Sequence, residues 1–354
     1  MDDSDTCTSA ELNRLFDHSL RLSTTFKKPY LFNLDYTNGF TQIGSNINAS
    51  IGRRELCGVR FWNENPNIVT IAEETGEVTT FDLRSADIVM EIENEYSTND
   101  LFDSFDISNG DKYFCLGGIK YEKEQVPILF YDIRKKTNSH RYVNCHGDYV
   151  TQVKFHPTKS NIIVTGSRDG LINIFNIDKR DKDEALLSTI NSGCSIETLN
   201  WHPKNGKNGY HLSCIALMSD FILFDMETED IVCQHKRSVI AEAIKRKSIN
   251  NCWIINCHSD SAEDVFVLVC SNFNNGERLR SLTVTGNSLK QRNNFANNKQ
   301  IVRCSAYNSR DNVLFTAGEE GIISVRDGRI PIAPQTDSNK LKEKVHEGQK
   351  SKPY

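Results

Sequence analysis

The sequence predicts an all-β fold in which one unit of short strands is repeated along the chain. The clearest unit, residues 146–176, contains three runs rich in β-branched and aromatic residues, with polar turns between them. Asp169-Gly170 separates the second and third runs, and an Asp-Gly pair in this position favours a tight hairpin because the turn needs a positive φ. The unit recurs at intervals of roughly 40–50 residues, a period typical of β-propeller blades. We therefore expect short sheets arranged around a central axis.

The clearest unit also gives the order of its strands. It begins with His146-Gly147-Asp148, and its strands are expected at 150–155, 162–167 and 171–176. Four further units follow the same order and end their third strand on Asp82, Asp132, Asp225 and Asp327. Their strands are expected at 59–61, 68–72 and 78–82; at 105–107, 113–117 and 128–132; at 196–201, 212–217 and 221–225; and at 302–307, 313–318 and 322–327. A divergent unit should add strands at 252–257, 265–270 and 279–284.

The two ends of the repeat depart from this pattern. Residues 30–35 have the composition of an inner strand, but residues 36–58 contain no recognisable pair of strands with an aromatic-Asp ending. The fold is therefore either a seven-bladed type with a shortened first blade or a ring of six blades. Pro331 and Pro334 disfavour an outer strand after the last unit, so we expect the alternating segment 18–26 to pair with that blade and close the ring.

Composition and charge argue against several classes of protein. The 354 residues are 38% hydrophobic and 25% charged with a net charge of −5, whereas a dedicated nucleic-acid binder usually carries a basic surplus. The N-terminus is acidic and lacks the apolar core of a secretory signal, and no run of about 18 apolar residues could span a membrane. We therefore expect a protein of the cytoplasm, the nucleus or both, with no nucleic acid and no membrane among its partners.

The eleven cysteines include no Cys-x-x-Cys pair, which fits reduced thiols in such a compartment. Cys252, Cys257 and His258 come nearest to a metal cluster, but their spacing matches no zinc pattern. We therefore expect buried structural cysteines, no metal and no other cofactor.

The sequence also lacks the common motifs of catalytic sites. Gly-x-Ser-x-Gly is absent, and Gly117-Gly118 is not followed by the Gly-Lys-Ser/Thr of a phosphate loop. His156-Pro157 and His202-Pro203 occupy the same turn of two units, so duplication of the repeat explains them better than catalysis does. We expect no enzyme; the remote alternative, a propeller hydrolase, would need carboxylates or a metal converging on the central channel.

The aromatic-Asp strand ends, the Gly-x-x-Asp-Gly turn and the His-Gly opening of the clearest unit resemble the WD-repeat family. Within that family, segments 150–157, 165–171 and 173–175 are similar to the branch of WD repeat-containing protein 89. The resemblance covers most of 28–327 and implies a non-enzymatic scaffold for protein–protein interaction, whose partners it does not identify.

The resemblance also implies a hydrogen-bonded set of four side chains in a blade: a loop His, a strand Ser or Thr, a turn Asp and a strand Trp. In the clearest unit these map onto His146, Ser167, Asp169 and Phe175, with Gly170 completing the turn. Phenylalanine has no N–H to donate, so that hydrogen bond is expected to be lost. Because other units lack the His, we expect the blades to depend more on apolar packing than on polar networks.

Two successive units carry Phe81-Asp82-Leu83-Arg84 and Tyr131-Asp132-Ile133-Arg134. These segments resemble the aromatic-Asp-x-Arg box of WD-repeat substrate receptors of cullin-4 ubiquitin ligases, in which the Arg faces the adaptor. The resemblance makes Asp82, Arg84, Asp132 and Arg134 candidate partner-binding residues, because Arg presents a fixed fork of donors. The alternative is an Arg that is solvated or paired locally at a strand end.

The segments outside the repeat are short. Thr8 and Glu11 fit a capping box before an apolar face made by Leu12, Leu15 and Phe16, so residues 1–17 should contain a short helix. That helix could dock on a ligase adaptor or cover the side of the propeller. We expect the propeller at 18–330 and a disordered polar tail at 331–354.

Overall fold

The structure of the chain is a computed structural model. It describes residues 31–35, 39–43, 55–85, 87–96, 100–119, 126–204, 206, 208–271, 278–296, 298–319 and 322–328. The N-terminal helix expected in 1–17, the closing strand expected at 18–26 and the tail 331–354 lie outside these residues.

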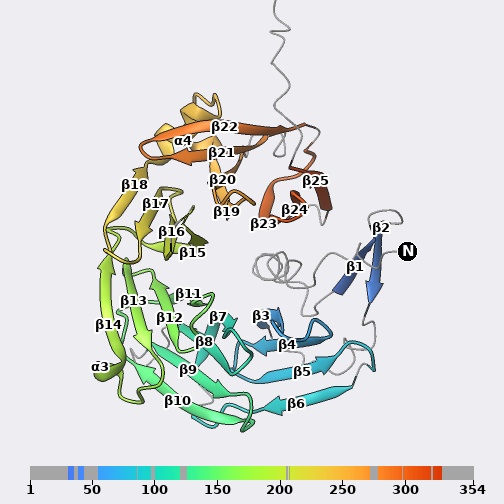
Figure 1. Ribbon diagram of the computed structural model, residues 1–354, viewed down its shortest axis with the longest axis vertical. Helices are drawn as coiled ribbons and strands as arrows, with labels where there is room; N and C mark the ends of the chain where they lie inside the picture. The colour runs from blue at the N-terminus through green and yellow to red at the C-terminus, as the bar shows by residue number, and fades with distance from the viewer. Residues whose placement is uncertain are drawn as a thin grey trace, which may run out of the picture.

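Six antiparallel sheets stand side by side around a central axis, as expected for a β-propeller (Figure 1). In each sheet, strands that follow one another in the sequence pair with one another, because the turns between them are short. Five of these sheets have four strands and the last has three, counted over the described residues.

The strand bounds of the six sheets are as follows. The first two sheets are β3 (Leu56–Phe61), β4 (Ile68–Glu73), β5 (Val78–Asp82) and β6 (Ile88–Ile92), then β7 (Leu101–Ile107), β8 (Tyr113–Ile119), β9 (Pro127–Asp132) and β10 (Thr137–Val143). The next two are β11 (Val150–Phe155), β12 (Ile162–Ser167), β13 (Leu171–Asn176) and β14 (Leu186–Asn191), then β15 (Ile196–Pro203), β16 (Tyr210–Ala216), β17 (Phe221–Asp225) and β18 (Ile231–His235). The last two are β19 (Trp253–Ser259), β20 (Val265–Cys270), β21 (Leu279–Thr285) and β22 (Ser288–Phe295), then β23 (Val302–Asn308), β24 (Val313–Gly318) and β25 (Ile323–Asp327).

A hairpin of β1 (Leu31–Asp35) and β2 (Gly39–Ile43) precedes these sheets. Figure 1 shows it between the last sheet and the first. The inner strand expected at 30–35 is therefore present, but a full seventh blade is not formed by the described residues, and the six-bladed alternative holds. β25 pairs only with β24 within the described part of the chain, so its outer edge is where the expected strand 18–26 would add.

The inner strands of neighbouring sheets contact one another around the axis. Each of the six inner strands carries a β-bulge near its start, where one extra residue interrupts the pairing with the second strand. The bulged residues are Cys57, Asp103, Thr151, Glu197, Ile255 and Arg303. The same irregularity at the same place in every blade supports the origin of the fold in one repeated unit.

The core lies between the sheets. One apolar cluster, for example, joins Phe130 of β9 and Val153 of β11 to Phe175 of β13, which is 1% exposed. Burying each such ring contributes about 1.5–3 kcal/mol, so a blade gains its stability only when neighbours cover both of its faces.

Three short helices complete the described structure: α3 (Lys182–Ala185), α4 (Arg237–Ala243) and the 3-10 helix η1 (Ile249–Asn251). None of the helices in the described ranges has the length and apolar character needed to cross a bilayer. All ten cysteines in the described residues have free thiols, and eight of these are buried, as expected from the sequence.

Candidate functional site

The tight turn between β12 and β13 is built as the Asp-Gly pair predicts. Gly170 has a φ of 85°, a conformation that side-chain-bearing residues rarely adopt. A Cβ on Gly170 would also lie 3.2 Å from the carbonyl oxygen of Cys194. The Asp169 carboxylate closes the turn, because its Oδ1 accepts the N–H of Leu171 at 2.9 Å. Both the backbone and the packing therefore require glycine here.

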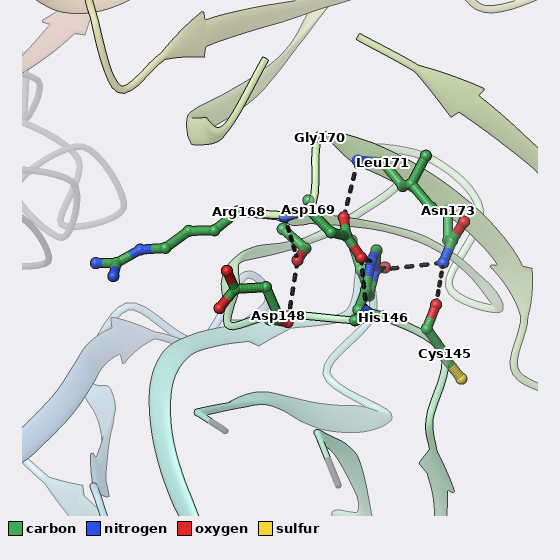
Figure 2. Close-up of polar contacts among 12 residues, drawn as sticks. Cys145, His146, Asp148, Arg168, Asp169, Gly170, Leu171 and Asn173 are labelled. Atoms are coloured by element: carbon green, nitrogen blue, oxygen red, sulfur yellow. Dashed lines mark hydrogen bonds and ion pairs between the residues drawn. The ribbon is translucent and has the colours of Figure 1, made fainter. Parts of the chain in front are cut away.

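His146 lies against this turn and is held at both ring nitrogens (Figure 2). Its Nδ1 is 3.1 Å from Oδ2 of Asp169, and its Nε2 is 2.8 Å from Oγ1 of Thr165. Gly147 N–H also donates to Oδ2 of Asp169, at 2.8 Å. Burial alone would raise the pKa of the Asp169 carboxyl, but the hydrogen bonds from His146, Leu171 and Gly147 outweigh it and lower that pKa to about 2.

The strand hydroxyl in this network belongs to Thr165, so the assignment of that role to Ser167 was wrong. Thr165 and Ser167 are two residues apart on one face of β12, and only the strand register decides which of them meets the imidazole. Ser167 instead donates to the carbonyl of Asp148 at 3.0 Å and accepts the N–H of Asp169 at 3.1 Å.

The polar contact expected to be lost at Phe175 is partly replaced by Asn173 (Figure 2). The Asn173 amide donates to the carbonyl of Cys145 at 2.8 Å and lies 3.4 Å from Nε2 of His146. Asn173 pairs with Thr165 across the β12–β13 ladder, which brings its side chain to the histidine. Phe175 itself is buried against Tyr142, with 5.4 Å between ring centroids.

Asp169, His146 and Thr165 together have the connectivity of an acid–base–nucleophile triad. Their burial argues against that chemistry, because the His146 side chain and Thr165 are each 0% exposed and no substrate can reach the hydroxyl. The network instead holds the loop before β11 against the β12–β13 turn through the hydrogen bonds of His146 and Gly147 to Asp169. No group of three side chains that could bind a metal occurs within the described ranges.

The two aromatic-Asp-x-Arg boxes end β5 and β9, at equivalent places in neighbouring blades, but their arginines differ. The Arg84 side chain is 66% exposed and forms a bidentate ion pair with Asp82 of the same box. Its Nε is 3.0 Å from Oδ1, and its Nη2 is 2.6 Å from Oδ2. The side-chain hydrogen bond from Arg84 is the main cause that lowers the pKa of Asp82 to about 2. Arg84 is therefore paired locally at the end of its strand, which is the alternative to an arginine that faces a partner protein.

In the second box, Asp132 accepts the backbone N–H groups of Arg134 and Lys135, each at 3.1 Å, and Nζ of Lys135 lies 3.5 Å from its Oδ2. The exposed Arg134 side chain has no ion pair with any residue that the structure describes. Of the two arginines, Arg134 is therefore the one whose guanidinium could donate hydrogen bonds to a partner without first breaking an ion pair with a described residue.

Sequence reasoning missed polar contacts that join the inner strands of neighbouring blades. The Arg60 Nε lies 3.2 Å from Oδ1 of Asp106, and Oδ2 of Asp106 accepts the N–H of Phe155 at 2.8 Å, so three blades are linked in series. The inner strands therefore add polar contacts between blades to the apolar packing that the sequence predicts. The only sequence signal was a polar residue close to the end of each of these strands.

A second series joins the next three blades. The Asn200 amide donates to Oδ1 of Asn256 at 2.8 Å, and the Asn256 amide donates to the carbonyl of Ser305 at 3.1 Å. His202 bonds Ser213 within its blade and Ser259 in the next, at 2.8 and 2.6 Å. All of these residues lie on or beside the innermost strands, where they fix the register between blades.

The two His-Pro pairs do not occupy the same turn, because His156-Pro157 follows the end of β11 whereas His202-Pro203 is the last part of β15. Unlike His202, His156 turns its Nδ1 toward the backbone N–H groups of Thr158 and Lys159, at 3.2 Å each. Burial lowers the pKa of His156 to about 4, so its ring is neutral near pH 7. The duplicated pair therefore has a structural role in each blade.

Comparison with known proteins agrees with this architecture. The family model described as "WD domain, G-beta repeat" matches residues 137–176, which span β10 to β13. A WD repeat-containing protein 89 homolog of Dictyostelium discoideum is 25% identical over 238 residues, which cover 64% of this chain and 64% of that protein. This match agrees with the branch that the sequence resembles.

Two yeast relatives carry WD-repeat names as well. An uncharacterized WD repeat-containing protein of Saccharomyces cerevisiae is 33% identical over 142 residues, 40% of this chain and 35% of that protein. Another of Schizosaccharomyces pombe is 22% identical over 279 residues, 76% of this chain and 81% of that protein. The matches span about a third of the first of these relatives and just under two thirds of the Dictyostelium protein.

Among solved structures, a chain in the crystal structure of a mitotic checkpoint complex superposes with a TM-score of 0.60 at 11% identity. The superposition covers 84% of this chain and 81% of the other, and at this identity it supports the fold alone. The repeated blades, the His146–Asp169 turn and these matches lead to one conclusion: the chain carries a WD repeat, folds as a β-propeller and is similar to WD repeat-containing proteins.

Proposed function

We propose that this protein is a non-enzymatic scaffold that binds other proteins through the loops of its propeller. The observation that carries the proposal is the rigid, repeated framework of six blades, tied together near the axis by buried polar contacts. Such a framework holds its connecting loops in fixed positions, and loops on a rigid scaffold are where binding usually occurs. The free thiols support a place in the cytoplasm or nucleus, where such assemblies remain reduced.

The arrangement of polar residues favours binding over catalysis. In the best-formed acid–base network, Asp169–His146–Thr165, the imidazole and the hydroxyl are buried, and the network serves the β12–β13 turn. A hydrolase would need an accessible nucleophile or a metal-bound water. The hydroxyl of this network is buried, and no group of three possible metal ligands occurs among the described residues.

Affinity capture with chemical crosslinking tests the proposal. We expect the tagged protein, purified from its native cells, to bring down protein partners in near-stoichiometric amounts, with crosslinks that map to propeller loops. The sharper control is a folded variant with substituted loop residues, which should lose a partner and keep its melting temperature. A protein that stays alone at native expression, or that turns over small-molecule esters or phosphates, would contradict the scaffold function.

We also propose, as a second candidate, that the scaffold serves as a substrate receptor of a cullin-4 ubiquitin ligase. The Arg134 side chain favours it, because it is exposed and has no ion pair with any described residue. A guanidinium in this state suits carbonyl or carboxylate groups across an interface. Arg134→Ala should weaken capture of the adaptor more than Arg84→Ala, since Arg84 must first release Asp82. Lys136→Ala, in the same turn as Arg134, is the matched control.

The double variant Arg84→Ala with Arg134→Ala should abolish that capture. Unchanged recovery of the adaptor by the double variant would refute the receptor role and leave the scaffold function standing.

A further inference from the structure

The connection between β18 and β19, residues 236–252, differs from the corresponding connections of the other blades. It contains α4 and η1, and Figure 1 shows α4 beside β22 at the periphery of the propeller. The other connections between a fourth strand and the next inner strand are much shorter and span 93–100, 144–149, 192–195 and 296–301. The insertion is therefore an addition to the repeat.

One side of α4 is fixed to the core. Ile240 and Ile244 are each no more than 1% exposed and pack in a cluster with residues of β17, β18, β20 and β21. The N–H of Arg237 donates to Oδ1 of Asp220 at 2.8 Å, and its Nε donates to the carbonyl of Cys252, also at 2.8 Å. These contacts tie the insertion at its start and its end, so its outer side is held in a defined position.

That outer side is apolar in part. Val239 is 47% exposed and Ile249 is 46% exposed. The β16–β17 turn, which Asp220 ties to the start of α4, adds Leu217 at 42% and Met218 at 68% exposure. Two of these side chains belong to the insertion and two to the turn bound to its start, and large apolar side chains that gather in water are a mark of an interaction surface.

The insertion is also basic. Lys236, Lys245 and Lys247 are exposed, and segment 236–252 contains five basic residues with Glu242 as its single acidic one. The chain as a whole has a net charge of −5, so this positive surplus is local. We call the four apolar residues and these three lysines the α4 surface.

Positive charge is also concentrated behind the α4 surface. Arg280 is only 1% exposed, and its guanidinium donates to the Asn294 side chain at 3.2 Å and to the carbonyl of Ile244 at 2.8 Å. Burial, together with the nearby Arg278 and Arg246, lowers the pKa of Arg280. Because the hydrogen bonds of Arg280 go to neutral oxygens, its charge reinforces the positive potential at this place.

We propose that the α4 surface is the docking site for an acidic segment of a partner protein, with apolar side chains that contact Met218 and Val239. Carboxylates of that segment would lie beside Lys236 and Lys247. The inference rests on the scaffold function proposed above and adds the place and the chemistry of one partner. Opposite charge speeds and orients the encounter, whereas apolar anchors in the centre supply most of the affinity.

Fluorescence anisotropy of short labelled peptides, measured with the full chain, tests this proposal. The probe is a peptide of alternating glutamate and leucine. Two comparison peptides keep its length, one with serine in place of leucine and one with lysine in place of glutamate. We expect saturable binding of the first peptide, weaker binding of the serine peptide, and no binding of the lysine peptide. Binding of the first peptide should fall as salt rises.

Two surface variants and a matched control locate the binding. Lys236→Glu with Lys247→Glu, and separately Met218→Ser with Val239→Ser, should each weaken binding about tenfold or more. Lys179→Glu with Lys182→Glu, which changes the same charge beside α3, should leave it unchanged. The melting temperature of every variant should match that of the wild type, because all of these side chains are at least partly exposed.

Three results would overturn the proposal: no binding of the glutamate–leucine peptide, equal binding by the surface variants, or equal binding of the serine peptide. Anionic vesicles or RNA that bind through the same lysines while the peptide does not would overturn it as well. Partners recovered equally well by both α4-surface variants would remove this inference alone and would leave the scaffold function intact.

Discussion

Replacing Gly170 with valine should destabilise the third blade, and the structure gives the size of the effect. A residue with a β-branched side chain at a φ of 85° carries a strain of about 1–3 kcal/mol. The new Cβ would also lie 3.2 Å from the carbonyl oxygen and 3.4 Å from the nitrogen of Cys194. Displacing that backbone adds about 1–2 kcal/mol, so the free energy of unfolding should fall by roughly 3 kcal/mol.

Gly110→Val is the matched control. Gly110 has a φ of 73°, and a Cβ built there meets no atom within 4 Å, so this variant has the backbone strain without the crowding. Equilibrium unfolding in urea measures both losses, and amide hydrogen exchange at Leu171 should show that the Gly170→Val damage is centred on the β12–β13 turn. A Gly170→Val protein as stable as Gly110→Val would refute the role assigned to the Cys194 contact.

Two further predictions concern the polar contacts. The pKa of Asp169 lies near 2 against an ordinary 3.8, so its ionised form contributes about 2 kcal/mol to stability that is present above pH 4 and lost as the pH falls toward 2. Asp169→Asn should flatten this part of the stability–pH curve, and a variant curve parallel to that of the wild type between pH 4 and 2 would contradict the network. Asn256→Leu leaves the Asn200 amide without its acceptor and should cost about 1–3 kcal/mol. In the Asn256→Leu variant, a second substitution, Asn200→Leu, should lower the free energy of unfolding by less than it does in the wild type. If urea unfolding shows that the two losses simply add, the two amides do not depend on each other.

The first three strands of each unit could be predicted from the sequence because they are buried on at least one face. The predicted 162–167 and 171–176 coincide with β12 and β13, and 265–270 coincides with β20. The outer strands β6, β10, β14, β18 and β22 were missed, because most of their residues are at least partly exposed, as at Leu187 and Ile231, and so they lack a clear alternation. β2 was missed because it has no aromatic-Asp ending.

The candidate site was recognised only in part. His146, Asp169 and Gly170 could be placed because the Asp-Gly turn fixes their spacing along the chain. The choice between Thr165 and Ser167 depended on strand register, which no local pattern determines. Arg84 pairs with Asp82, whereas Arg134 has no ion pair among the residues described. This difference depended on turn geometry that the two similar boxes do not reveal.

By itself, the sequence determined the repeated unit, its turns and its buried strands, since these follow from hydrophobic pattern and backbone preference within short segments. Only the tertiary structure decided how the blades are joined. The contacts of Arg60 with Asp106 and of Asn200 with Asn256 form between residues far apart in the chain, which meet when the sheets stack around the axis. The same is true of the α4 surface, whose two segments are joined where Asp220 of the β16–β17 turn accepts the N–H of Arg237 at the start of α4. Contacts of this kind depend on relative position in space, which a pattern of neighbouring residues does not specify.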